Sequence, residues 1–360
     1  GRVEVVGGSV PEGLEVVAQW GTLEADAAVE SDGSFELRLT AEPAVSGFLG
    51  VRAPDEGGLV PALIRLEDPL LPESIRVVVL PDRWTIQRGA YAGTEVDVRP
   101  SEAASGGVLP SFWGLAFPFE QDGRLQTVLD STYWTGGLTT WPEDAFPVAV
   151  VLDREASSSR LESADSVELW THLDRLEAVL GRELFRPARM EDLPAPDPDL
   201  GDRPPGAVLV RVDSTISLRG RADAVTAAST WFRIEDVGSW SGSEVSRLGV
   251  VSADARAGWI AVSAREHLGN GRIVMHEAMH ALGVGHGCAW RSIQTYCESL
   301  ITEEPTPDDV AHLEVLEAAR ASEKELDTQY GILPAVFGDR ALRQGLSPIP
   351  GVDLTPPGEG

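Results

Sequence analysis

The sequence predicts a multidomain α+β protein, with an all-β N-terminal part followed by an α/β layer. Three observations lead to this fold class. Short runs of β-forming residues, separated by glycine, proline and acidic turns, fill roughly the first 80 residues. After about residue 144 the order changes to a strand, a long helix, further strands and a second helix. The 360 residues are enough for two domains with cores of their own.

Six segments of the N-terminal part, residues 1–80, are expected to be short β-strands. The Asp32-Gly33 turn leads into the third of them. The pattern resembles the small β-sandwich modules that are similar to the carboxypeptidase regulatory domain. This resemblance implies a spacer, docking or folding module, and we find no site chemistry in it. The expected strands are residues 2–6, 14–20, 35–39, 47–53, 59–66 and 75–80.

Residues 81–143 are expected to form a β-rich connecting segment. Residues 84–86 and 94–98 are its predicted strands, and residues 101–107 are a loop of small residues. The segment either runs along the following domain or bridges the two domains. A group of aromatic residues comes next, and such a cluster is more often core than a carbohydrate platform. Its members are Phe112, Trp113, Phe117, Phe119, Trp134 and Trp141.

The next domain is predicted over residues 144–325. Residues 147–152 are a continuous apolar run, which suits a strand in a sheet that is covered on both faces. A helix over residues 164–180, capped by Ser163 and ended by Gly181, carries a leucine stripe on one face. Further strands are expected at residues 207–212, 245–252 and 258–263.

Eleven residues that start at His276 have the form H-E-x-x-H-x-x-G-x-x-H. Histidines four residues apart lie on one face of a helix and can hold one zinc ion, and Asn270 can cap this helix. The motif glycine ends the helix, so that a third histidine can reach the same metal. His276, His280 and His286 would leave one zinc position open for water, and Glu277 can take a proton from that water. The pattern predicts metal-assisted hydrolysis.

The extended motif resembles the metzincin superfamily of zinc peptidases. The resemblance implies a metzincin-like α/β zinc-peptidase domain, zinc as cofactor, and hydrolysis of a peptide or protein substrate. It also implies that residues 258–263 are an edge strand that lines the cleft. A second match supports it, because Thr306 followed by Pro307 and two aspartates starts a helix that resembles the closing helix of matrixin-like domains. His312 on this helix is expected at the surface.

Gln294 stands eight residues after the third histidine, where metzincins carry a methionine in a tight turn beneath the zinc. Glutamine is similar in length, but its amide needs hydrogen-bond partners when it is buried. We expect the change to leave zinc chemistry in place. By the same resemblance Tyr296 is a candidate stabiliser of the transition state, and a packed or surface tyrosine is the alternative.

The chain has two cysteines, Cys288 and Cys297, which flank this turn. A disulfide between them is the preferred prediction and would stabilise the turn by roughly 2–3 kcal/mol. Two free buried thiols in a reducing compartment are the alternative. Zinc ligation by either cysteine would close the open catalytic position, which argues against it.

Residues 191–205 are rich in proline and aspartate. Their carboxylates are the oxygen donors that calcium prefers, but the spacing fits no defined calcium loop, so a solvated loop is preferred over a Ca²⁺ site. The aspartates of this segment are Asp192, Asp197, Asp199 and Asp202.

The tail, residues 326–360, is rich in proline and glycine and either wraps the surface or stays mobile.

Charge and hydropathy limit the partners and the location that are expected for this protein. A net charge of −28 argues against nucleic acid as a partner. No apolar run approaches the ~20 residues that a membrane span needs. The chain begins at Gly1 without an apolar leader, which favours a mature secreted or cell-surface protein whose signal peptide has been removed. Neither the oligomeric state nor the cleavage preference follows from the sequence.

Two other functions stay compatible with these observations. The chain could be a surface or matrix binding protein that keeps zinc in a catalytically silent peptidase fold, which the missing methionine favours and Glu277 disfavours. It could also be a latent protease that its N-terminal region holds shut. The predicted primary function is a secreted zinc-dependent endopeptidase.

Overall fold

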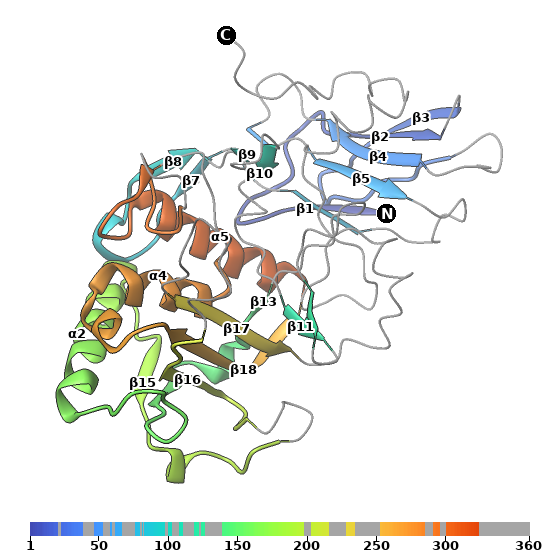
Figure 1. The fold of residues 1–360 in the computed structure, drawn as a ribbon. Helices are drawn as coiled ribbons and strands as arrows, with labels where there is room; N and C mark the ends of the chain where they lie inside the picture. Colours follow the sequence, from blue (N-terminus) through green and yellow to red (C-terminus); the bar gives the residue numbers. More distant parts are fainter. Residues whose placement is uncertain are drawn as a thin grey trace.

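The structure is a computed structural model in which helices and strands are mixed (Figure 1), so the predicted α+β class is confirmed at this level. The expected strand at residues 245–252 and most of the aromatic group lie outside the residues that it describes. The described residues are 1–20, 23–38, 47–52, 58–59, 62–66, 76–79, 81, 83–97, 100–102, 108–110, 119–121, 124–126, 139–197, 203–215, 228–234, 253–284, 291–295 and 300–323.

The main sheet has the strand order β12-β11-β17-β18-β16-β14-β15, and β13 pairs with β18 beside this path. Strands β14 (Val148–Leu152), β16 (Ala207–Val212) and β18 (Ala253–Val262) are parallel, and β17 (Ala228–Ile234) runs antiparallel to β18. The strands predicted at residues 147–152 and 207–212 are thereby confirmed. The other strands of this sheet are β11 (Phe119–Gln121), β12 (Arg124–Gln126), β13 (Thr139–Thr140) and β15 (Phe185–Pro187).

The prediction that residues 258–263 form an edge strand is wrong. They belong to β18, which pairs with β16 on one side from Gly258 to Val262 and with β17 on the other. The strong β formers of this segment indicated a strand but could not identify its neighbours, because the partner strands come from distant parts of the chain.

Helix α2 (Ser163–Leu180) follows β14 and ends at Gly181, whose φ of 74° is left-handed, as predicted. Its leucine stripe is buried, as predicted. Ser163 is not the N-cap, however. Glu162 takes that place, because Asp165 accepts a hydrogen bond from the Glu162 backbone N–H at 2.5 Å and a capping box forms. The stripe consists of Leu169, Leu173, Leu176 and Leu180.

Two further helices, α4 (Gly271–Ala281) and α5 (Pro307–Glu323), hold the residues of the zinc motif and of the Thr-Pro-Asp-Asp match. Figure 1 shows α5 crossing the middle of the molecule, with α2, α4 and the main sheet on one side and the N-terminal strands on the other. Within the described part of the chain, no helix is long and apolar enough to span a membrane. The 3₁₀ helices are η1 (Gly89–Tyr91), η2 (Glu143–Ala145), η3 (Met190–Asp192) and η6 (Arg265–Gly269).

Residues 83–97 run along the domain that carries the zinc motif. Strands β7 (Arg83–Thr85) and β8 (Glu95–Asp97) lie where the two strands were predicted, pair antiparallel, and both contact α5. Between them, η1 lies against the end of α2. A Cβ on Gly89 would come within 2.1 Å of the Val179 carbonyl oxygen, so this approach requires glycine. Further along, part of the expected 101–107 loop belongs to β9 (Pro100–Glu102), which pairs with β10 (Val108–Pro110).

The N-terminal part is all β among its described residues. An antiparallel sheet has the order β3-β2-β4-β5, and β1 pairs with β6 in parallel. The Asp32-Gly33 turn is confirmed, because the Ser34 backbone N–H donates to the Asp32 carboxylate at 2.9 Å and Gly33 has a φ of 86°. The strands are β1 (Arg2–Val5), β2 (Glu15–Trp20), β3 (Leu23–Ala28), β4 (Gly47–Arg52), β5 (Ala62–Leu66) and β6 (Arg76–Val79).

Two features of this part depart from the sequence analysis. Strand β3 was missed, because its residues are poor β formers and the ladder with β2 supplies the pairing. The strand expected at residues 35–39 is wrong over 35–38, and residue 39 lies outside the described residues. Phe35 is instead a buried anchor, whose backbone N–H donates to the Gly1 carbonyl oxygen at 2.9 Å.

Candidate metal centre

Helix α4 carries two of the predicted ligands and the predicted base. The Asn270 side chain caps it by accepting a hydrogen bond from the Ile273 backbone N–H at 3.2 Å, as predicted. Gly283, with a φ of 99°, turns the chain after the last helical residues, also as predicted. Glu277 and His280 are buried, with 4% and 3% of their surface exposed.

The structure brings the imidazoles of His276 and His280 together. Their Nε2 atoms lie 3.0 Å apart, and the rings are nearly perpendicular, with centroids 4.5 Å apart. Two nitrogens bound to one tetrahedral zinc at about 2.0–2.1 Å would be separated by roughly 3.3–3.4 Å. The two side chains therefore need only a small adjustment to bind the same ion.

The other nitrogen of each ring has a backbone partner. His276 Nδ1 lies 2.6 Å from the Ile293 carbonyl oxygen, and His280 Nδ1 lies 2.6 Å from the Val284 carbonyl oxygen. A carbonyl can only accept a hydrogen bond, so we assign the proton to Nδ1 in both rings. In a neutral ring this leaves a lone pair on Nε2, and such outer contacts orient metal-binding histidines.

His276 is neutral near pH 7, because burial lowers its pKa to about 4. Its Nε2 lone pair then faces the neighbouring imidazole at 3.0 Å. Two lone pairs at this distance repel unless a cation lies between them. The donor pair thus fits a metal that prefers imidazole, such as zinc.

A turn at residues 291–295 forms the floor beneath His276. The Gln294 side chain is 1% exposed, and its Nε2 donates to the His276 carbonyl oxygen at 2.7 Å. Its backbone N–H donates to Ser292 Oγ at 2.8 Å. Gln294 Oε1 is buried and finds no hydrogen-bond partner among the described residues. The Gln294 amide thus has a partner for its N–H group, and its oxygen has none among the described residues.

Asp309, near the start of α5, holds this turn. Its carboxylate accepts hydrogen bonds from the Ile293 backbone N–H at 3.1 Å and from the Thr306 backbone N–H at 2.7 Å. The hydroxyls of Ser292 and Thr306 also donate to it. Burial raises the pKa of Asp309, and these hydrogen bonds oppose the shift. Since Ile293 also accepts from His276, Asp309 supports the orientation of a predicted ligand through one peptide unit.

Several predicted site residues lie outside the described residues, so their predictions stay open. These are His286, Tyr296, Cys288 and Cys297. Within the described part of the chain, no three His, Cys, Asp or Glu side chains form a group that could hold a metal. His286, the third ligand that the motif implies, lies outside this part of the chain. The calcium prediction is likewise untested, because Asp199 and Asp202 also lie outside.

The sequence did not predict several residues that stabilise the candidate metal centre. The Trp141 indole N–H donates to the Ala281 carbonyl oxygen at 2.7 Å, at the end of the motif helix, and Trp141 is buried as expected for a core aromatic. Asp309 was interpreted only as a helix-end charge. The expectation of a surface position for His312 is wrong, since it is buried and burial lowers its pKa to about 3.

Neither the known protein-family models nor the curated proteins contain a match to this chain. The resemblance to metzincins therefore stays a prediction from the sequence motifs.

Proposed function

We propose that this protein is a zinc-dependent endopeptidase. The observation that carries the proposal is the pair of facing Nε2 atoms, 3.0 Å apart, with each Nδ1 held by a backbone carbonyl. His276 and His280 would hold the ion, and His286 is the third ligand that the motif implies. The zinc-peptidase motif places Glu277 beside the first ligand, which a purely structural site would not require.

Bound zinc would supply a Lewis acid that acidifies a water and polarises the scissile carbonyl. Glu277 accepts the proton of the attacking water and returns it to the leaving amine. Its burial removes competing solvent, which strengthens this proton transfer. Tyr296 is the proposed donor to the oxygen on which negative charge develops.

A catalytically silent zinc-binding protein is the second candidate. Gln294 favours it, because a polar amide stands where a methionine is expected and its oxygen is buried without a partner among the described residues. Both candidates share the metal centre, so only turnover separates them. The predicted secreted or cell-surface location applies to both candidate functions.

Cleavage of a peptide library by the zinc-loaded protein tests the proposal, with mass spectrometry as the readout. The comparison variant is Glu277→Gln, which keeps size but removes the base. Its matched control is Glu266→Gln, an exposed glutamate in η6 shortly before the motif helix. We expect cleavage by the parent and the control, and a loss of at least 100-fold in Glu277→Gln. Zinc binding without cleavage by any of them would favour the silent protein.

A further inference from the structure

Helix α5 is buried on every side over two turns. All eight residues from Asp309 to Leu316 are buried, including the polar side chains of His312 and Glu314. A surface helix buries only one stripe, so this stretch must be covered from opposite directions. The turn at residues 291–295 contacts its start. Residues 84–91, here named the clasp, contact it further along.

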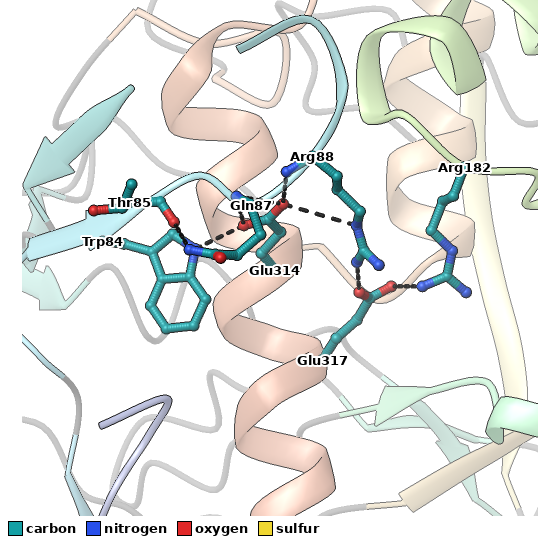
Figure 2. A network of polar contacts seen from close by, with 7 residues as sticks. All are labelled: Trp84, Thr85, Gln87, Arg88, Arg182, Glu314 and Glu317. Atoms are coloured by element: carbon teal, nitrogen blue, oxygen red, sulfur yellow. Dashed lines mark hydrogen bonds and ion pairs between the residues drawn. The ribbon is translucent and has the colours of Figure 1, made fainter. Parts of the chain in front are cut away.

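Glu314 is the anchor of the clasp. Its carboxylate accepts hydrogen bonds from the Trp84 indole N–H at 2.8 Å and from the backbone N–H groups of Gln87 at 2.9 Å and Arg88 at 3.2 Å. The Arg88 guanidinium lies 3.7 Å away (Figure 2). Three convergent N–H groups around one buried carboxylate form a fixed geometry, unlike an exposed ion pair.

A second carboxylate ties the clasp to α2. Glu317 lies between the guanidiniums of Arg88 and Arg182, with Arg182 Nη1 at 2.7 Å (Figure 2). Arg182 immediately follows the residue that ends α2, and there Gly89 and Gly181 approach so closely that a Cβ on either would clash. Helices α2 and α5 are therefore held together by a segment more than 200 residues upstream of α5.

The same helix supports the metal centre at its other end. Asp309 holds the Ile293 peptide, and the Ile293 carbonyl accepts from His276 Nδ1 at 2.6 Å. Asp309 and Glu314 are five residues apart on α5, which is about 7.5 Å along a helix axis. A shift of the helix at the clasp would move Asp309 by a similar amount, because a packed helix moves as a rigid body.

We infer that the clasp is a positioning element of the metal centre, in which Glu314 seats α5 so that Asp309 can fix the turn that orients His276. This inference rests on the proposed function. Residues 84–91 then belong to the zinc-binding unit. Removal of the N-terminal part, which includes them, would weaken zinc binding. The coupling runs through packed residues and one helix, and each contact in it is present in the structure.

The test uses the full chain and compares Glu314→Gln with Glu95→Gln. Glu314→Gln keeps the length of the side chain but turns an amide N–H₂ toward the N–H donors of the clasp. Glu95 is the matched control, because it lies in the neighbouring strand β8 and its carboxylate forms an exposed ion pair with Arg83. Zinc affinity is measured by chelator competition, and the absorption spectrum of the cobalt-loaded protein reports on ligand geometry.

We expect zinc affinity to fall by about 10-fold in Glu314→Gln, the lower end of what outer-shell partners contribute. The visible cobalt bands should shift at saturating cobalt, which a uniform loss of stability would not cause. Glu95→Gln should match the parent in both. Equal affinity and spectra in all three proteins would overturn the inference and leave the proposed function intact. A parent that binds no zinc would overturn both.

A second measurement covers the case in which Glu314→Gln fails to fold. A specific protease site is inserted between Gly106 and Gly107 of the parent, and the folded, zinc-loaded chain is cut there. We expect the two pieces to elute together with zinc bound. If the N-terminal piece separates and the remainder keeps zinc at parental affinity, the clasp has no role in positioning the metal.

Discussion

Helix α5 carries two buried carboxylates, and each accepts several hydrogen bonds, but from different parts of the chain. Asp309 accepts from groups at most 17 residues away, in the turn beneath His276 and at the start of its own helix. Glu314 accepts from groups 226 to 230 residues away. The comparison shows how one helix can join a local turn, which orients a metal ligand, to a distant N-terminal segment.

The two carboxylates also differ in their surroundings. Asp309 accepts hydrogen bonds from backbone amides and hydroxyls, and burial raises its pKa. Glu314 has the Arg88 guanidinium 3.7 Å away in addition to its N–H donors. The following changes act on one of the two anchors or on residues close to them, from the largest expected effect to the smallest.

Asp309→Ala should have the largest effect. It leaves the Ile293 and Thr306 amides and the Ser292 hydroxyl without their acceptor in a buried site, and we expect a loss of about 3–4 kcal/mol in the free energy of unfolding. Urea denaturation measures it. Asp308→Ala, at the neighbouring position, should cost less than about 1 kcal/mol, mainly through the helix dipole. Equal losses in the two variants would show that the Asp309 carboxylate does not stabilise the turn at residues 291–295.

His312 lies between the two anchors and makes stability depend on pH. Its pKa is lowered to about 3 in the fold from 6.5, so the unfolded state takes up a proton first as pH falls. The stabilising contribution is fully present above pH 6.5 and is lost as pH falls toward 3. Between pH 6.5 and 5 the loss is roughly 2 kcal/mol relative to a His312→Gln variant. Parallel pH dependences of unfolding in the parent and the variant would contradict this.

Trp84→Phe tests the distant anchor with a smaller change. It keeps a ring in place but removes the indole N–H that donates to Glu314 at 2.8 Å. We expect a loss of roughly 1.5–2 kcal/mol in the free energy of unfolding, since the acceptor is charged and buried. Trp170→Phe, at a partly buried position of α2, is the control and should cost less. A neutral Trp84→Phe would mean that the clasp binds without this hydrogen bond.

Gln294→Met should have the smallest effect. It removes the hydrogen bond to the His276 carbonyl but also removes a buried oxygen that lacks a partner among the described residues. These terms nearly cancel, so we expect stability to change by less than about 1 kcal/mol and zinc to stay bound. Complete loss of the metal would reveal a polar network around Gln294 beyond its contact with His276.

Local signals predicted the elements around the centre well. The apolar runs of β14 and β16, the leucine stripe of α2 and the Asn270 and Gly283 ends of the motif helix all follow rules that act within a few residues. The partner of His276 Nδ1 followed no such rule, because the Ile293 carbonyl, 17 residues away, depends on how the turn folds back under α4. The partner of His280 Nδ1 is local, since Val284 lies only four residues further along the chain.

What the sequence did not predict depends on distant neighbours. His312 was expected at the surface, but α5 is covered on both sides by segments that its own periodicity cannot reveal. The interior position of β18 depends on β17, and strand β3 exists because β2 pairs with it. The Glu314 anchor depends on residues 84–88, and no spacing in the chain links these two sites.

X-ray absorption at the zinc edge of the loaded protein is the most direct test of the central claim. The account predicts one zinc per chain with three imidazole nitrogens and one oxygen at about 2.0–2.1 Å. Sulfur at about 2.3 Å would place a cysteine on the metal, and an absence of bound zinc would remove the centre itself. Either result would contradict the zinc-peptidase account.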